Sequence, residues 1–177
     1  VLLSLGVSRK NIFFLGKKLN IPVYNLYKNL NIVYKEINRF LKRYHGKHII
    51  YTHSWEGGNE DHDACFVIVK KILYQNIKVK TAFEFSHYHN HETIILPFKV
   101  QNFIFDKRKI FRTNIKFLDK IKYIKYLFNY TSQLYLWIPI FPFVIIKILL
   151  NDYGNIKIIK KNLIIKKPHK GTLLYEK

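Results

Sequence analysis

The order of apolar patterns along the 177 residues predicts an α/β protein with a mostly parallel sheet and helices on its faces. Short apolar or alternating runs, typical of strands, alternate with longer stretches in which apolar residues recur every three or four positions, as in helices. The order strand, helix, strand, helix, strand is typical of parallel sheets. The length and the 49% apolar content suit a single compact domain over residues 1–177.

The first two elements of that order have clear local signals. Residues 12–15, Ile-Phe-Phe-Leu before Gly16, form a short apolar run that predicts a buried strand. Residues 29–44 carry apolar side chains at i, i+3, i+4 and i+7, which predicts an amphipathic helix that ends before Gly46.

The next three elements follow directly along the chain. Residues 48–53 predict a strand, and residues 61–73 predict a helix with Asp61 as its N-cap. Residues 79–86 alternate apolar and polar side chains and predict a third strand.

The second half of the sequence is less regular. Residues 113–130 place apolar side chains at helical spacing and predict a helix. Residues 134–146 contain no charged residue, but they are fewer than a membrane span requires, and two prolines interrupt them. We expect them to form a buried helix or loop under the sheet or, because lysines flank them, a peripheral contact with a membrane surface.

The net charge of +20, from 31 Lys and Arg against 11 Asp and Glu, is compatible with a nucleic-acid partner. The basic residues are spread evenly, however, without an Arg-rich stripe or an aromatic RNA-binding motif. No nucleic-acid partner is therefore expected, and a basic nucleic-acid-binding protein is kept as an alternative. A single cysteine excludes a disulfide scaffold, and the first residues do not form a signal segment, so a cytoplasmic location is expected.

One short region departs from this basic background. Four of the 11 acidic residues lie within residues 56–63, no Lys or Arg occurs within residues 48–69, and seven of the eight histidines lie within residues 45–91. Carboxylates and imidazoles hold divalent metals and transfer protons. Because ligands of open α/β sheets bind beyond the carboxyl ends of the strands, the loop after residue 53 is the expected site.

Within this region, His62 falls in the first turn of the predicted helix, and we expect it to face the crevice. Gly57 and Gly58 let the backbone turn tightly and approach a ligand. Asp61 and Asp63 flank His62 and are expected to orient its ring. A capping or surface histidine is the alternative interpretation of His62.

Five ordered segments of the chain carry a family resemblance. The central one, residues 55–64, reads Trp-Glu-Gly-Gly-Asn-Glu-Asp-His-Asp-Ala. The others are Leu5-Gly6-Val7 with Phe13-Phe14-Leu15-Gly16, Glu84-Phe85-Ser86-His87-Tyr88, Tyr130-Thr131-Ser132-Gln133 and residues 167–176. Together they resemble the PIG-L/LmbE-like N-deacetylases, whose central segment is Glu-Gly-Gly-His-x-Asp-His-x-Ala. The resemblance implies a Rossmann-like three-layer sandwich and a zinc-dependent hydrolase that removes an N-acetyl group from a sugar or glycoconjugate.

The resemblance also implies roles for three residues of the central segment. His62 stands where the family has its third zinc ligand. Asp61 belongs to the Asp–His pair that polarises the substrate carbonyl and stabilises the oxyanion. Asn59 stands in place of the histidine of that pair; it can donate a hydrogen bond to an oxyanion, but it cannot carry a positive charge or donate a proton.

The chain departs from the family pattern upstream of these residues. The family's other zinc ligands and its general base come from an AHPDDE motif before the Leu-Gly-Val segment, and this sequence contains no His-Pro-Asp. We therefore expect the domain to lack the family's first strand and helix. A catalytic zinc needs three protein ligands, so we expect this chain to be inactive alone and a longer gene product to be the active enzyme. A non-catalytic relic or binding module of the same fold is the alternative.

Four further histidines have a functional and a structural interpretation. His53 ends a strand near the site, and it either lines the site or is exposed. His87, His89 and His91 share one face of an extended segment, and they either bind a metal or are solvated.

Three other residues are singled out by their positions. Trp55 either stacks on a sugar or packs the loop. Cys65 lies in an apolar helix face and is expected to be a core residue and not a nucleophile. His169 lies in the C-terminal segment of the resemblance and is expected to be structural.

Overall fold

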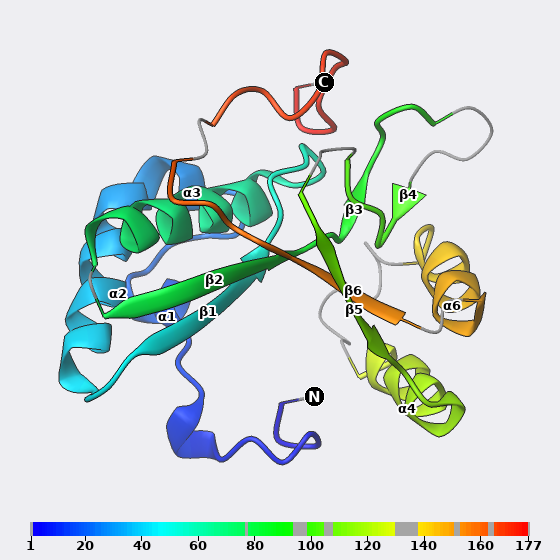
Figure 1. The fold of residues 1–177 in the computed structure, drawn as a ribbon, viewed down its shortest axis with the longest axis horizontal. Coiled ribbons are helices and arrows are strands. Elements are labelled where there is room, and N and C mark those ends of the chain that lie inside the picture. The colour runs from blue at the N-terminus through cyan, green and yellow to red at the C-terminus, as the bar shows by residue number, and fades with distance from the viewer. Residues whose placement is uncertain are drawn as a thin grey trace. The chain divides into compact units, whose positions relative to one another are not determined.

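The protein has a mixed α/β fold (Figure 1). The structure, a computed structural model, describes residues 2–76, 78–93, 99–104, 108–129, 138–150, 153–162 and 165–176. The chain divides into two compact units. The larger unit comprises Gly16–Phe111 with Asn155–Lys177, and the smaller comprises Val1–Leu15 with Arg112–Gly154.

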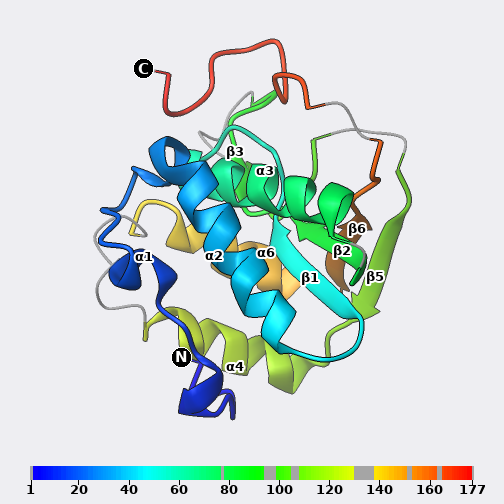
Figure 2. The ribbon, with the colours of Figure 1, turned by 90° about the vertical axis from the view of Figure 1, so that its left-hand side faces the viewer.

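The larger unit is built on two parallel strands joined by a helix. β1 (His48–His53) pairs with β2 (Val79–Phe85), and α3 (Glu60–Gln75) connects the two strands. α3 packs on both strands, and α2 (Leu30–Arg43) packs on α3 (Figures 1 and 2). These four elements confirm the helices and strands predicted for residues 29–86.

The core of this unit lies between α3 and the strands. Its buried apolar side chains come from α3 and β2, namely Ala64, Phe66, Ile68, Val69, Ile72, Leu73, Val79 and Ala82. The parallel register sets His53 opposite Phe85, so both strands end at the same edge of the sheet. The loop that leads into α3 starts at this edge, where α/β sheets hold their ligands.

The rest of the sheet differs from the prediction. The strand order is β1-β2-β6-β5, with β5 at Ile110–Asn114 and β6 at Tyr153–Ile158. β6 runs antiparallel to β2 and sets Lys157 opposite Glu84. The α/β class is therefore confirmed, but the prediction of a mostly parallel sheet is wrong. The alternation of strand and helix reaches only to β2, and β6 enters the sheet from the opposite end.

The strand predicted at residues 12–15 is also wrong. Ile12 follows a 3₁₀ turn, η1 (Arg9–Asn11), and Leu15 begins a short helix, α1 (Leu15–Lys18). Phe14 is 73% exposed, so the run is not buried. An apolar run of four residues does not by itself distinguish a strand from a turn. The remaining short elements of the larger unit are η2 (Leu26–Asn29), β3 (Tyr88–His89) and β4 (Lys99–Val100).

The smaller unit contains two helices, α4 (Phe117–Leu127) and α6 (Phe141–Leu150). Lys120 Nζ donates to the carbonyl oxygen of Leu149 at 3.0 Å, which joins the two helices. α4 is shorter than the helix predicted at 113–130, because β5 extends to Asn114. Residues 130–137, which include one resembling segment, lie outside the described residues. No helix of the described part is long and apolar enough to cross a membrane.

Candidate functional site

α3 begins with Asn59 as its N-cap. Asn59 has an extended backbone, and its Oδ1 accepts hydrogen bonds from the backbone N–H groups of Asp61 (2.9 Å) and His62 (3.2 Å). The prediction that Asp61 caps the helix is therefore wrong. The N–H of Asp61 already lies inside the first turn of the helix. Asn59 precedes this turn, and its side chain can accept the free N–H groups that follow it.

Two glycines bring the preceding loop against other segments. Gly57 has a φ of +72°, and a Cβ there would lie 2.5 Å from Leu173 Cδ2. A Cβ on Gly58 would lie 1.8 Å from the carbonyl oxygen of Tyr88, which excludes any side chain. The predicted tight turn is confirmed. The close approach serves the protein's own C-terminal segment and the segment after β2.

Three imidazoles meet at the shared edge of β1 and β2. His62 lies in the first turn of α3, His53 ends β1, and His87 follows β2. The rings of His53 and His62 are stacked, with centroids 3.8 Å apart and planes 6° apart. His87 stands edge-on to both rings, at 5.6 Å from His53 and 5.0 Å from His62. The structure therefore brings His53 and His87 to the residue that the sequence singles out.

Burial keeps these three imidazoles neutral. Burial lowers the pKa of His62 to about 4. The pKa of His53 is lowered to about 3, first by burial and then by the charge of His62. The pKa of His87 is lowered to about 3 by burial, followed by the charges of His62 and His53. Neutral imidazole is the form that binds metals and accepts protons.

The carboxylate of Asp61 anchors a distant segment. Its two oxygens accept hydrogen bonds from the backbone N–H groups of Tyr24 (2.7 Å) and Leu26 (3.0 Å). These bonds fix the chain just before and within η2 against the start of α3. The role of Asp61 toward a substrate carbonyl stays a prediction.

The carboxylate of Asp63 holds the glycine loop. Its oxygens accept the N–H groups of Glu56 and Gly57, both at 3.0 Å, and the hydroxyl of Tyr175 at 2.7 Å. Asp63 is 2% exposed, and these three donors partly compensate for its burial, which still raises the pKa of the carboxyl. Asp63 thus ties the loop, α3 and the C-terminal segment together.

The imidazole cluster does not form a complete zinc centre. A bound zinc ion lies in the ring plane of each imidazole ligand, about 2 Å from the nitrogen. The nearly parallel planes of His53 and His62 do not converge on such a point. Within the described ranges, no group of three His, Cys, Asp or Glu side chains is placed to hold a metal. The described part of the chain offers His62 as one predicted ligand of an incomplete set.

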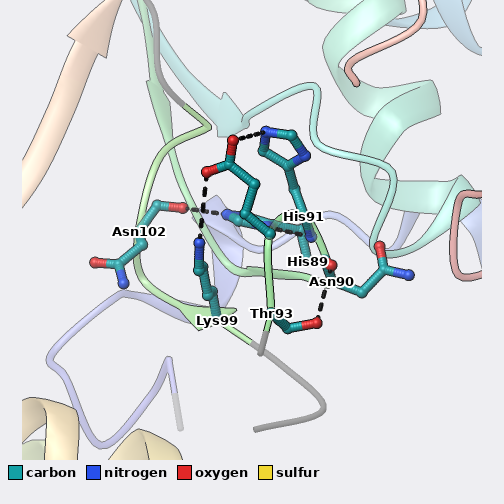
Figure 3. A network of polar contacts seen from close by, with 7 residues as sticks. His89, Asn90, His91, Thr93, Lys99 and Asn102 are labelled. Carbon is teal, nitrogen blue, oxygen red and sulfur yellow. Dashed lines mark hydrogen bonds and ion pairs between the residues drawn. The ribbon is translucent and has the colours of Figure 1, made fainter. Parts of the chain in front are cut away.

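His89 has a structural role (Figure 3). His89 is 1% exposed, and its Nε2 lies 2.8 Å from the carbonyl oxygen of Asn102. Because a carbonyl only accepts, Nε2 carries the proton, and Nδ1 accepts the backbone N–H of His91 at 3.1 Å. Both ring nitrogens are therefore used by the backbone.

The rings of His91 and His169 pack on each other. Their ring centroids are 4.8 Å apart, and His91 Nε2 lies 3.5 Å from a carboxylate oxygen of Glu92. The prediction that His87, His89 and His91 share one face is wrong. His87 packs against His62, while His89 bonds to Asn102 and His91 stacks on His169.

The C-terminal segment runs above α3 in both overall views and contacts the glycine loop (Figures 1 and 2). The backbone N–H of Leu174 donates to the carbonyl oxygen of Gly57 at 3.0 Å. The indole N–H of Trp55 donates to the carbonyl oxygen of Lys166 at 2.6 Å. Trp55 therefore packs the loop in this structure, and His169, 8% exposed, is buried in the same segment.

Cys65 is half-buried on α3. Burial, followed by the charge of Asp61, raises the pKa of its thiol to about 11. The thiolate, which is the nucleophilic form, is therefore disfavoured near neutral pH.

One buried carboxyl has no role predicted from the sequence. Glu56 is 2% exposed, and its partners Ser86, His87 and Tyr88 lie 30 to 32 positions further along the chain. No local pattern reveals such a pairing, because it depends on where β2 ends relative to β1.

No protein-family model, curated protein or solved structure matches this chain. The family resemblance therefore rests on the five sequence segments alone.

Proposed function

We propose that this chain carries the His62 side of a zinc-dependent N-deacetylase site of the PIG-L/LmbE-like kind, within a Rossmann-like domain. The supporting observation is that three of the five resembling segments meet at one place. They are residues 55–64, 84–88 and 167–176, which are far apart in the sequence.

Specific hydrogen bonds join these segments. The hydroxyl of Tyr175 donates to Asp63 Oδ2 at 2.7 Å across 112 positions of the chain. The carboxyl of Glu56 accepts the backbone N–H groups of His87 (2.7 Å) and Tyr88 (3.0 Å). This shared location of the three segments supports the proposal.

The proposal assigns each residue a limited task. His62, neutral and half-buried, is the zinc ligand, and Asn59 and Asp61 are assigned to the substrate carbonyl. The substrate class is an N-acetylated sugar or glycoconjugate, whose amide bond is broken by water. We expect no turnover from this chain alone, because the described residues do not assemble three ligands.

A non-catalytic relic or binding module is the second candidate, and Asn59 favours it. Its Oδ1 is committed to capping α3. Its side chain also hydrogen-bonds to Tyr88, which partly offsets the effect of burial that raises the pKa of that phenol. An amide with both ends engaged is less available to an oxyanion.

Calorimetric titration with Zn²⁺ tests the proposal. His62→Gln is expected to abolish the zinc-dependent heat, and His45→Gln, in the exposed loop before β1, serves as the matched control and should retain it. Equal binding by both variants would contradict the assignment of His62. Zinc-dependent release of acetate from an N-acetylated sugar by the unmodified chain would contradict its expected inactivity.

A further inference from the structure

The carboxyl of Glu56 lies at the centre of a buried hydrogen-bond network. Oε1 accepts the backbone N–H groups of His87 and Tyr88. Oε2 lies 2.7 Å from Ser86 Oγ and 3.0 Å from Ser54 Oγ. This carboxyl thus joins the end of β1 to the segment that follows β2.

Counting protons at Ser86 shows what this arrangement requires. Ser86 Oγ lies 2.6 Å from the carbonyl oxygen of Asn102 and 2.7 Å from Glu56 Oε2. Two oxygens at these distances need a proton between them, and a serine hydroxyl supplies only one. The carbonyl oxygen of Asn102 cannot donate. If Ser86 donates to Asn102, the proton in the other contact must come from Glu56.

We infer that Glu56 is held as a neutral carboxylic acid, which donates to Ser86 and positions His87 and Tyr88 beside His62. The proton chain then runs from Glu56 through Ser86 to Asn102, and every short contact contains one hydrogen. Ser54 donates to the remaining lone pair of Oε2. The protonation state of Glu56 does not depend on the proposed function. The importance of positioning His87 and Tyr88 does rest on the proposed function.

The surroundings agree with a neutral acid. Burial raises the pKa of Glu56 to about 7, and its hydrogen-bond contacts with Ser86, Ser54 and the backbone N–H groups of His87 and Tyr88 only partly oppose this rise. The titratable groups on the segments that this network joins are His53 at the end of β1, Glu60, His62 and Asp63 on α3, His87 and Tyr88 after β2, and Tyr175, which donates to Asp63. The imidazoles among them are neutral, so they do not stabilise an ionised carboxylate.

The isosteric variant Glu56→Gln tests the inference. Its amide oxygen can accept the same two backbone N–H groups, and its NH₂ group can donate to both serines. We expect Glu56→Gln to match the unmodified protein in urea unfolding at pH 5. Between pH 5 and pH 8, the folding constant of the unmodified protein should fall by roughly 100-fold relative to this variant, since only the glutamate must keep its proton. A pH-independent ratio, or a strongly destabilised Glu56→Gln at pH 5, would overturn the inference.

Infrared spectroscopy gives a second test that needs no folded variant. The unmodified protein at pH 6 should show the band of a buried carboxylic acid, and the band should disappear as the pH rises above 7. An absent band at pH 6 would overturn the inference. Neither experiment uses zinc or substrate. A negative result here therefore does not bear on the proposed function, and a failure of zinc binding does not bear on the protonation of Glu56.

Discussion

The histidines around His62 and the histidine at position 89 differ in what their ring nitrogens do. His53, His62 and His87 pack ring against ring, and Nδ1 of His53 is buried without a hydrogen-bond partner. His89, two residues after His87, gives one nitrogen to Asn102 and the other to the N–H of His91. His53 Nδ1 is therefore open to a ligand, whereas both ring nitrogens of His89 are used by the backbone.

This difference shows why histidine spacing alone does not identify a metal site. His87 and His89 lie on the same face of an ideal extended segment. In the structure, however, Nε2 of His89 lies 2.8 Å from the carbonyl oxygen of Asn102, whereas the ring of His87 packs against His53 and His62. The hydrogen bond to the carbonyl oxygen of Asn102 therefore distinguishes His89 as the structural imidazole.

Of the substitutions proposed near His62, Gly58→Ala should cause the largest loss of stability. The new Cβ would lie 1.8 Å from the carbonyl oxygen of Tyr88, a backbone atom that cannot rotate away. We expect a loss of about 3 kcal/mol or more in the free energy of unfolding, measured with urea. Gly16→Ala is the control, because its Cβ would have an ordinary contact at 3.7 Å. Equal stability of the two variants would contradict the described loop.

Acid should destabilise the protein through the same group. The pKa of His62 is about 4 in the folded protein against an ordinary 6.5, so the unfolded chain takes up protons first as the pH falls below 6.5. Stability contributed by the neutral ring is complete above pH 6.5 and is lost toward pH 4. We expect about 2 kcal/mol per histidine between pH 7 and pH 4.5. In His62→Gln the loss, measured by urea unfolding at the two pH values, should be smaller by that amount. An equal loss of stability in His62→Gln and in the unmodified protein would show that His62 is solvated.

The substitution His89→Gln should affect stability without affecting zinc. It removes the ring that bridges Asn102 and His91 and leaves buried groups less well paired, which costs about 1–2 kcal/mol. Urea unfolding checks the cost, with His45→Gln as the exposed control. A zinc affinity reduced by His89→Gln as much as by His62→Gln would remove the distinction between the two groups.

Much of the fold near the site could be predicted, because the signals there are local. The apolar spacing of residues 29–44 and the alternation of residues 79–86 correspond to α2 and β2. The errors concern partners far away in the sequence. The residue type of Asp61 favours an N-cap, but Asn59 has the extended backbone, and the carboxylate of Asp61 accepts the N–H groups of Tyr24 and Leu26. The direction of β6 and the proton on Glu56 likewise depend on contacts that no local pattern contains.

Nuclear magnetic resonance of the imidazole nitrogens during a Zn²⁺ titration tests whether His62 binds zinc while His89 serves only the fold. The signals of all eight histidines can be followed at once, so weak binding by an incomplete ligand set is still assigned to a residue. We expect the His62 nitrogen signals to shift first while those of His89 stay unchanged. Unmoved His62 signals, or His89 signals that shift before them, would contradict this expectation.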